Sequence, residues 1–408
     1  MSRPFDIPLP RVALWLALLG LCVYLLGLFS PILAPFVVAV VLAYVLHPLV
    51  LRLQAWRLPR ALAVLLVELL AILLAVLLVL LLVVLPWLAT PFVMGELSYV
   101  FILCIASLGL MMLAGYTGQV SLGHAAFVAI GAYAQAWLLG KGVPLLLSLP
   151  LAALISAAAG LLVGVPAIRV SGLYLAMVTL AFSIIVEQVV GHWSSVTGGF
   201  TGLSVPNAQI LGLDLGKPQV FYYFCLALLV LVLLALRNLL RSGIGRAFVG
   251  VRDSEAAAYA LGIAASRVKV GAFALSAGVT GLAGAALAHH LKYLTPDGFT
   301  LLLSLELVLM VVIGGLGSLR GAVLGAMLIS LLPSAISRIK PLLPEAVAKQ
   351  FGLEIFAFGL VLALFVLFEP AGLNGRWLKL RALLESFPLY RQDTFKRQKR
   401  YMKSERYR

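Results

Sequence analysis

Two polar segments interrupt an otherwise apolar chain, and their side chains are the ones that could bind or move something. The first runs Gly115-Tyr-Thr-Gly-Gln-Val-Ser-Leu-Gly-His124. Peptide groups and polar side chains in hydrocarbon are costly unless they find partners inside the protein. The segment is therefore expected where helices pack closely or where a polar solute passes. Its candidate residues are Gly118, Gln119, Ser121, Gly123 and His124.

Two ionisable side chains within predicted apolar helices, His124 and Glu306, are further candidates. An ionisable group inside a membrane is a functional hypothesis by default. The structural alternatives are an interior histidine held by hydrogen bonds and a carboxylate that pairs with a neighbour, and both are favoured over solute contact. The cluster Gly314, Gly315 and Gly317 is denser than helix packing requires and is expected to break a helix.

The second polar segment, residues 237–269, carries six Lys or Arg against two acidic residues. Within it, Ser254-Glu-Ala-Ala-Ala-Tyr-Ala-Leu261 predicts a short helix with Asp253 or Ser254 as its N-cap and Gly262 at its end. A small Ala-rich helix with basic flanks, held just below a membrane, suits insertion into a groove on a partner. An ordinary connecting loop is the alternative.

Composition excludes a soluble globular enzyme. Hydrophobic residues make up 63% of the 408 residues and charged residues 11%, whereas soluble domains carry about 25% charged residues. The net charge is +15, and residues 376–408 alone hold eleven Lys or Arg against three acidic residues. Such clusters beside membrane spans suit anionic lipids, so membrane lipids and not nucleic acid are the expected partners. The three cysteines show no metal-ligand spacing, and no cofactor or metal is expected.

The predicted fold class is all-α, a polytopic transmembrane bundle of about twelve spans. These are residues 12–29, 32–49, 61–85, 97–114, 122–139, 145–164, 172–190, 220–236, 270–289, 301–315, 319–336 and 352–368. The main basic clusters fall on one side of the membrane if both termini are cytoplasmic. A small-residue face at Gly278, Gly281 and Gly284 predicts close helix packing.

Six motifs occur together from about residue 92 onward. They are Gly118-Gln-Val-Ser-Leu-Gly-His-Ala-Ala-Phe127, Gly131-Ala-Tyr133, Thr197-Gly-Gly-Phe-Thr-Gly-Leu203, Glu255-Ala-Ala257 followed by Gly262, Lys269-Val-Gly-Ala-Phe-Ala-Leu-Ser-Ala277, and Gly314-Gly-Leu-Gly-Ser318. In this order and spacing, the chain resembles the LivM family of branched-chain amino-acid permeases. The resemblance covers roughly three quarters of the chain.

The resemblance implies the permease fold of an ABC importer in the bacterial inner membrane. Such a chain is a translocation subunit and not an enzyme, and it moves branched-chain amino acids or a related small solute by alternating access. The sequence has no Gly-x-x-x-x-Gly-Lys-Ser/Thr phosphate loop, so ATP hydrolysis is expected on partners. The implied partners are two ATPase subunits, a second, LivH-like permease chain and an external solute-binding protein.

The resemblance also assigns roles to residues. Those implied to contact an ATPase are Arg252, Asp253, Glu255, Ala256, Ala257 and Gly262. The implied translocation core adds Tyr133, Glu306, Gly314, Gly315 and Gly317 to the first polar segment. An external loop with Thr197, Gly198, Gly199, Thr201 and Gly202 would face the binding protein.

The N-terminal region departs from this family. Residues 1–86 carry three extra predicted helices, and Leu28–Leu49 followed by Arg57–Val64 resembles the start of the autoinducer-2 exporter-like (PerM) family. A natural fusion, a misassembled reading frame and a chimera all remain open. The expected organisation is an N-terminal membrane segment at 1–86, a permease domain at 92–375 with a coupling loop at 237–269, and a basic cytoplasmic tail at 376–408.

Two other functions stay open from sequence. One is an ATP-independent exporter or carrier, which the N-terminal resemblance suggests and which predicts transport without any ATPase. The other is a non-transporting membrane scaffold that binds partners through its basic tail. The motif around Glu255 favours the importer over both.

Overall fold

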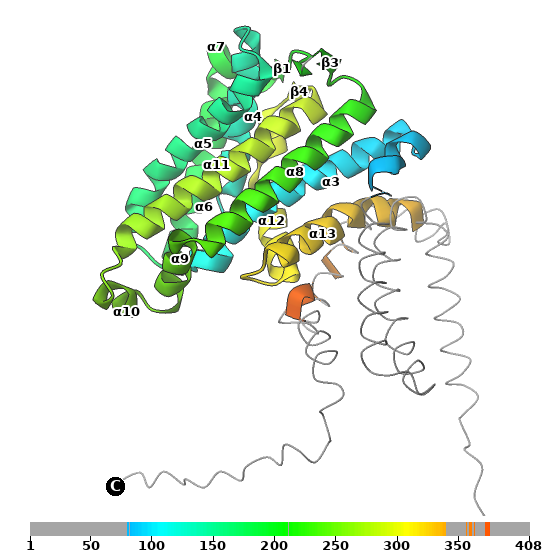
Figure 1. Ribbon diagram of the computed structural model, residues 1–408. Helices are drawn as coiled ribbons and strands as arrows, with labels where there is room; N and C mark the ends of the chain where they lie inside the picture. Colours follow the sequence, from blue (N-terminus) through cyan, green and yellow to red (C-terminus); the bar gives the residue numbers. More distant parts are fainter. Residues whose placement is uncertain are drawn as a thin grey trace, which may run out of the picture.

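The computed structural model describes residues 82–210 and 212–339, together with isolated positions at 80, 356, 359–360, 363 and 372–375. The described part is a bundle of helices with short loops (Figure 1). Its long elements are α3 (Pro91–Met111), α4 (His124–Gly140), α5 (Leu145–Ala167), α6 (Leu173–His192), α8 (Pro218–Arg241), α11 (Ala265–Leu291), α12 (Leu301–Gly314) and α13 (Leu319–Ile339).

Eight of the twelve predicted spans coincide with these described helices. By length and apolarity, seven helices in the described part could cross a membrane. These include α12, which with the 3-10 turn before it forms a 19-residue stretch at Pro296–Gly314. The eighth long helix, α4, has 17 residues, the lower end of the length that a span needs. The predicted spans at 12–29, 32–49, most of 61–85 and most of 352–368 lie outside the described residues, so the total of about twelve stays a prediction.

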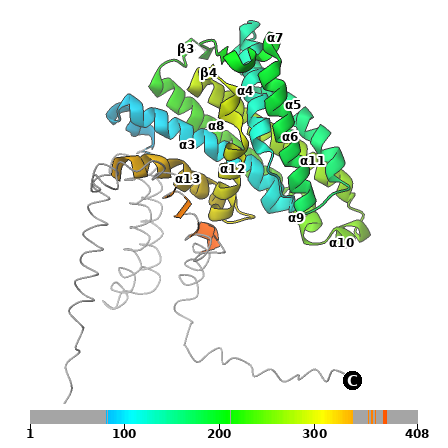
Figure 2. The ribbon, with the colours of Figure 1, turned by 180° about the vertical axis from the view of Figure 1, so that it is seen from behind.

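Short elements occupy the two ends of the bundle (Figures 1 and 2). One end carries α9 (Gly243–Asp253) and α10 (Glu255–Ala260). The other carries α7 (Ser194–Thr197), two 3-10 turns, η2 (Gly199–Thr201) and η3 (Pro296–Phe299), and four two-residue strands. Strand β1 (Leu203–Ser204) pairs antiparallel with β4 (Tyr293–Leu294), and β2 (Gln209–Ile210) with β3 (Leu213–Asp214). The described part is predominantly helical, in line with the expected all-α class; in the loop between α6 and α8, β2 and β3 form a short hairpin, and β1 ties this loop to β4.

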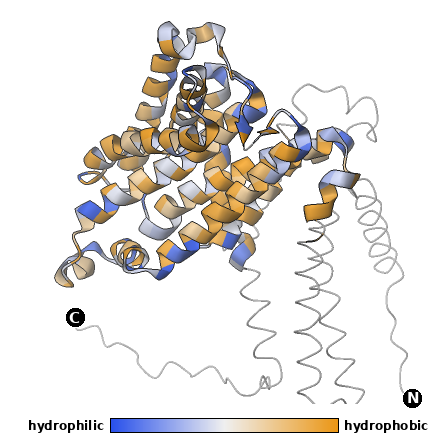
Figure 3. Ribbon diagram, turned by 45° about the horizontal axis from the view of Figure 1, so that its top comes forward, coloured by the Kyte–Doolittle hydropathy of each residue, from blue (hydrophilic) through white to orange (hydrophobic). Residues whose placement is uncertain are grey.

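Helix α3 is the centre of the bundle. It continues without a break into η1, a π-helical stretch at Met112–Tyr116. The span Pro91–Tyr116 is 89% buried, while the other candidate spans are 33% to 61% buried. It packs against α8, α11, α12 and α13. The outer faces of the surrounding helices stay apolar, and hydrophilic residues gather at helix ends and loops (Figure 3). A bundle in lipid needs this arrangement, since lipid tails solvate apolar side chains as well as a protein core does.

Glycines set the approach of α11 to its neighbours, as the small-residue pattern predicts. A Cβ on Gly284 would lie 2.0 Å from the Val128 carbonyl oxygen, and one on Gly131 would lie 2.0 Å from the Gly281 carbonyl oxygen. Helices α4 and α11 therefore touch backbone to backbone. Without a hydrophobic force between helices in lipid, such close contact is what dispersion needs to hold them together.

Replacing Gly284 with alanine should separate α4 from α11 and lower the stability of the chain by about 1–3 kcal/mol, the usual cost of overpacking. The measurement is the thermal unfolding midpoint of the full chain in mild detergent. Gly271→Ala on the same helix is the matched control, because a Cβ there meets nothing within 4 Å. Equal midpoints for the two variants would contradict the backbone contact.

Candidate functional site

The first polar segment turns back into the bundle between η1 and α4. Gly118 makes the turn with a φ of +71°, a conformation that favours glycine. The backbone N–H of Gln119 donates to the Leu113 carbonyl oxygen at 3.2 Å, and the Thr117 hydroxyl donates to the same oxygen at 2.6 Å. The segment that follows the π-helical end of α3 thus donates hydrogen bonds to a carbonyl of that end.

His124, the first residue of α4, is fully buried and lies in a continuous chain of hydrogen bonds. The Ser276 hydroxyl donates to the Gly109 carbonyl oxygen at 2.7 Å, so it accepts from His124 Nε2 at 2.8 Å. Nδ1 is then the acceptor and receives the Ser121 hydroxyl at 3.0 Å. A neutral imidazole with one donor and one acceptor nitrogen is fully satisfied by this chain. The favoured interpretation of His124 as a hydrogen-bonded interior histidine agrees with this geometry.

The start of α4 is held by side chains from two other helices. The first N–H groups of a helix have no partner within it. The Leu122 N–H donates to Thr179 Oγ1 on α6 at 2.9 Å, and the Ala125 N–H donates to Ser304 Oγ on α12 at 2.9 Å. A Cβ on Gly123 would lie 2.2 Å from the Thr179 carbonyl oxygen. The polar segment is therefore a junction of α3, α4, α6, α11 and α12.

The predicted helix break at Gly314–Gly317 is confirmed. Helix α12 ends at Gly314, and Gly315 and Gly317 have φ values of +101° and +81°. The break lies directly against the end of η1, because a Cβ on Gly115 would be 2.7 Å from the Gly317 nitrogen. Two interruptions of the helical backbone thus meet at the end of the bundle that carries α9 and α10.

Arg252 at the end of α9 reaches into this meeting point. Its Nη1 donates to the Gly115 carbonyl oxygen at 3.0 Å and lies 3.3 Å from where a Cβ of Gly317 would be. Its Cγ would be 3.0 Å from a Cβ on Gly118. The neighbouring Asp253 carboxylate holds the guanidinium at 2.9 Å. The sequence placed Arg252 only on the partner-facing loop, whereas in the fold its head group also faces the core.

The predicted short helix exists as α10, and Ser254 is its N-cap, accepting a hydrogen bond from the Ala257 N–H at 3.3 Å. Of the two cap candidates, Ser254 is therefore the one used. Glu255 forms an ion pair of 2.5 Å with Lys269, whose side chain is nearly buried at the start of α11. Only Ala258 of α10 is buried. The exposed surface consists of Ala256, Ala257, Tyr259, Ala260, Leu261 and Gly262.

The loop expected to be external is a compact knob at the opposite end. Gly198, Gly199 and Gly202 all have positive φ. The Thr197 hydroxyl is buried, bonding the Val190 carbonyl at 2.6 Å. Tyr293 donates to the Thr201 carbonyl, which ties the loop to β4. Phe200 and Trp193 stay largely exposed.

Tyr133 and Glu306 do not join the His124 junction. Tyr133 packs against Phe299, with ring centroids 5.9 Å apart, near the knob. Glu306 is half-buried on α12, and no described basic side chain pairs with it. The expected pairing of Glu306 with a neighbour is therefore not seen within the described residues.

Sequence reasoning missed several members of the site. Ser276, Thr179 and Ser304 lie within apolar helices, and Lys269 lies at a helix start. A second buried cluster, Gln135 with Ser148 at 2.8 Å and His289 at 3.2 Å, was also missed. The available signal was polar residues inside predicted spans, but a single sequence does not show which helices bring them together.

The described part is thus a bundle of apolar helices long enough to span a membrane, with the small exposed helix α10 at one end. Comparison with known proteins agrees. Residues 92–367 match the family described as branched-chain amino acid transport system / permease component, and the chain belongs to this family. This family is the one that the sequence motifs indicate, and its description is that of a permease component.

Two relatives are high-affinity branched-chain amino acid transport system permease proteins LivM. The one from Salmonella typhimurium is 36% identical over 55% of this chain, and the one from Escherichia coli is 35% identical over the same share. In both cases the match spans 59% of the relative's length. A probable LivH permease protein from Methanocaldococcus jannaschii is 25% identical over 72% of this chain and 95% of its own. No solved structure matches the chain.

The comparisons do not support the resemblance of residues 1–86 to the autoinducer-2 exporter-like family, since the family match begins at residue 92. That segment also lies almost entirely outside the described residues.

Replacing Ser276 with alanine should cost about 1–3 kcal/mol, because it leaves the buried His124 Nε2–H without its acceptor. The readout is the unfolding midpoint of the full chain in detergent. Ser98→Ala is the matched control, since that buried hydroxyl bonds only the Met94 carbonyl within its own helix. If Ser276→Ala behaves like Ser98→Ala, the hydrogen-bonded chain through His124 is wrong.

Proposed function

We propose that this chain is a permease subunit of an ATP-driven importer in a bacterial inner membrane, with both termini in the cytoplasm. It moves branched-chain amino acids or a related small solute by alternating access. The observation that carries the proposal is the exposed helix α10, which is tied to the helix breaks of the core through its neighbour α9. Relatives named as branched-chain amino acid permeases support the solute class.

The partners proposed are two ATPase subunits, a second permease chain of the LivH type and an external solute-binding protein. Helix α10 suits an ATPase groove, because it offers small side chains with Tyr259 and Leu261 exposed at its end. The knob at 197–203 suits the binding protein, because it is a rigid, exposed surface at the opposite end of the bundle. The domain boundaries at 1–86, 92–375 and 376–408 are part of the same proposal.

The mechanism proposed uses two polar links between the loop and the core. The Glu255–Lys269 ion pair joins α10 to α11, and Arg252 joins α9 to Gly115 and the Gly317 break. Few apolar contacts hold α10, so these links decide how far its movement is passed on. A push from an ATPase on α10 would then shift the ends of η1, α11 and α12 together.

Removal of the Glu255 charge should uncouple the ATPase from the core. Glu255→Gln leaves the nearly buried Lys269 ammonium unpaired, so α10 loses its fixed position. We expect ATP-dependent leucine uptake by the assembled complex in proteoliposomes to fall at least about tenfold, roughly 1.4 kcal/mol of lost coupling. Glu255→Asp should retain part of the activity.

Asp297→Asn is the control for this test, because it removes an exposed carboxylate at the opposite end of the bundle. Membrane insertion should be equal for all three variants. Full uptake by Glu255→Gln would overturn the role of α10.

Arg252→Met should separate ATP hydrolysis from transport, because methionine keeps much of the apolar stem but cannot bond the Gly115 carbonyl. We expect near-normal assembly and ATPase activity with uptake per ATP hydrolysed reduced about tenfold or more, the value of roughly one charge-assisted hydrogen bond. Arg246→Met on the exposed face of the same helix should leave the ratio unchanged. If the variant loses ATPase binding while its uptake per ATP hydrolysed stays unchanged, Arg252 contacts only the partner.

A further inference from the structure

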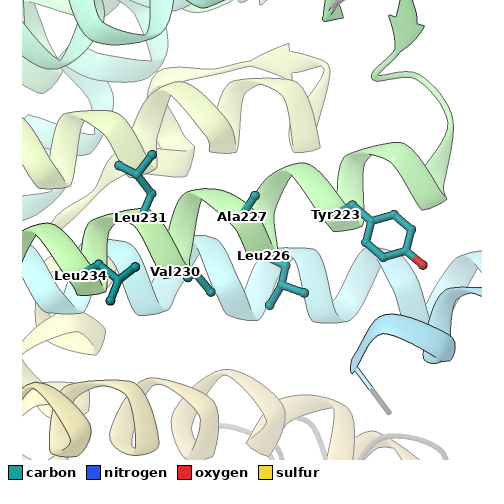
Figure 4. Close-up of a pocket in the computed structure, with 6 residues that line it drawn as sticks. All are labelled: Tyr223, Leu226, Ala227, Val230, Leu231 and Leu234. Atoms are coloured by element: carbon teal, nitrogen blue, oxygen red, sulfur yellow. The ribbon is translucent and has the colours of Figure 1, made fainter. Parts of the chain in front are cut away.

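A groove of about 620 Å³ follows one face of α8 (Figure 4). Its lining among the described residues is apolar except for the Tyr223 hydroxyl at one end, and consists of Tyr223, Leu226, Ala227, Val230, Leu231 and Leu234. We call it the α8 groove. Leu231 and Val230 are well exposed, so no described part of the chain covers it.

The lining residues recur at intervals of three and four, which is one face of an α-helix. Continued along α8, the same face reaches Arg237 and then Arg241. At about 100° per residue, Arg241 lies on the same face of α8 as Tyr223, about five turns further along the helix. The apolar groove therefore leads directly to two guanidinium groups.

A third guanidinium joins them. Arg246 Nη1 donates to the Arg241 carbonyl oxygen at 3.3 Å, which brings its head group to the end of α8. All three arginines are exposed. Among the described residues, the ion pairs join Arg252 to Asp253 and Lys269 to Glu255, and none involves these three. The cluster has positive charge without a described acidic partner.

We propose that the α8 groove and these arginines form a binding site for an anionic phospholipid. One acyl chain lies along Ala227–Leu234, and the phosphodiester lies at Arg237 and Arg241. Half of a bilayer's hydrocarbon is about 15 Å, or about ten helical residues, which matches the distance along α8 from Ala227 to Arg237. Guanidinium groups bind phosphate oxygens in pairs. A zwitterionic head group adds a cation that the arginines repel, so an anionic head group suits the cluster better.

The charges favour a lipid over a protein as the occupant. A protein helix in the groove would have to place acidic groups against three arginines at the membrane surface. No acidic side chain of the described residues forms an ion pair with these arginines. Anionic lipids supply that charge throughout the inner leaflet. The lipid site rests on the proposed function in one respect, the choice of the inner leaflet. That choice follows from the assignment of α9 and α10 to the cytoplasm.

The test uses the full chain in nanodiscs of equal parts phosphatidylglycerol and phosphatidylcholine. After release in mild detergent, native mass spectrometry counts the lipids that stay bound. We expect phosphatidylglycerol to be retained about fivefold or more over phosphatidylcholine, the effect of about one guanidinium. Arg237→Gln with Arg241→Gln should abolish the preference. Arg267→Gln with Arg320→Gln, which removes equal exposed charge elsewhere at this end, should keep it.

A second measurement identifies what fills the groove. A photoreactive benzoylphenylalanine at Leu231 should crosslink to phospholipid, and Ala227→Trp should block the groove and reduce retention of both lipids. Crosslinking to residues 1–79 or to another subunit would overturn the proposal, as would an unchanged preference in the Arg237/Arg241 variant. Neither measurement depends on transport, so a failed importer hypothesis would be recognised separately.

Discussion

Backbone groups released where a buried helix stops must find partners inside the protein, and this constraint shapes the bundle. Two helices stop at the same place, α3 through η1 and α12 at Gly314. The two helix ends contact each other, because Gly115 lies against Gly317. Arg252, from the loop outside the bundle, donates a hydrogen bond to the Gly115 carbonyl. Since α3 with η1 is the most enclosed of the described spans, anything that moves its end must move the helices around it.

The same constraint explains why His124 is structural. The polar segment brings an imidazole and the free N–H groups of a helix start into the interior. Side chains from α6, α11 and α12 satisfy these groups, so the segment fastens several helices at one point. A solute that passes beside this junction would meet a surface whose polar groups are already paired. Specific recognition is then better served by an external binding protein.

Packing is uneven along the bundle, and the unevenness fits the proposed mechanism. Backbone contacts at Gly131 and Gly284 hold α4 and α11 rigidly together. Helix α10, in contrast, buries only Ala258 and depends on a few polar contacts for its position. A loosely held element attached to a rigid core by defined links can act as a lever, because its displacement is transmitted and not absorbed.

The sequence by itself determined the membrane class, eight helices of the described part, the glycine break, the small helix before Gly262 and the family. These follow from local properties: apolar length, glycine density and the spacing of a cap from its helix. It did not determine which side chains pair. Arg252 could be placed on the loop but not against Gly115, and Glu255 could be marked for a partner but not paired with Lys269. Only the tertiary structure decided these. The Arg252–Gly115 hydrogen bond joins residues 137 positions apart, and the Glu255–Lys269 ion pair joins α10 to α11. Both depend on how helices cross, and helix crossing leaves no periodic trace in one chain.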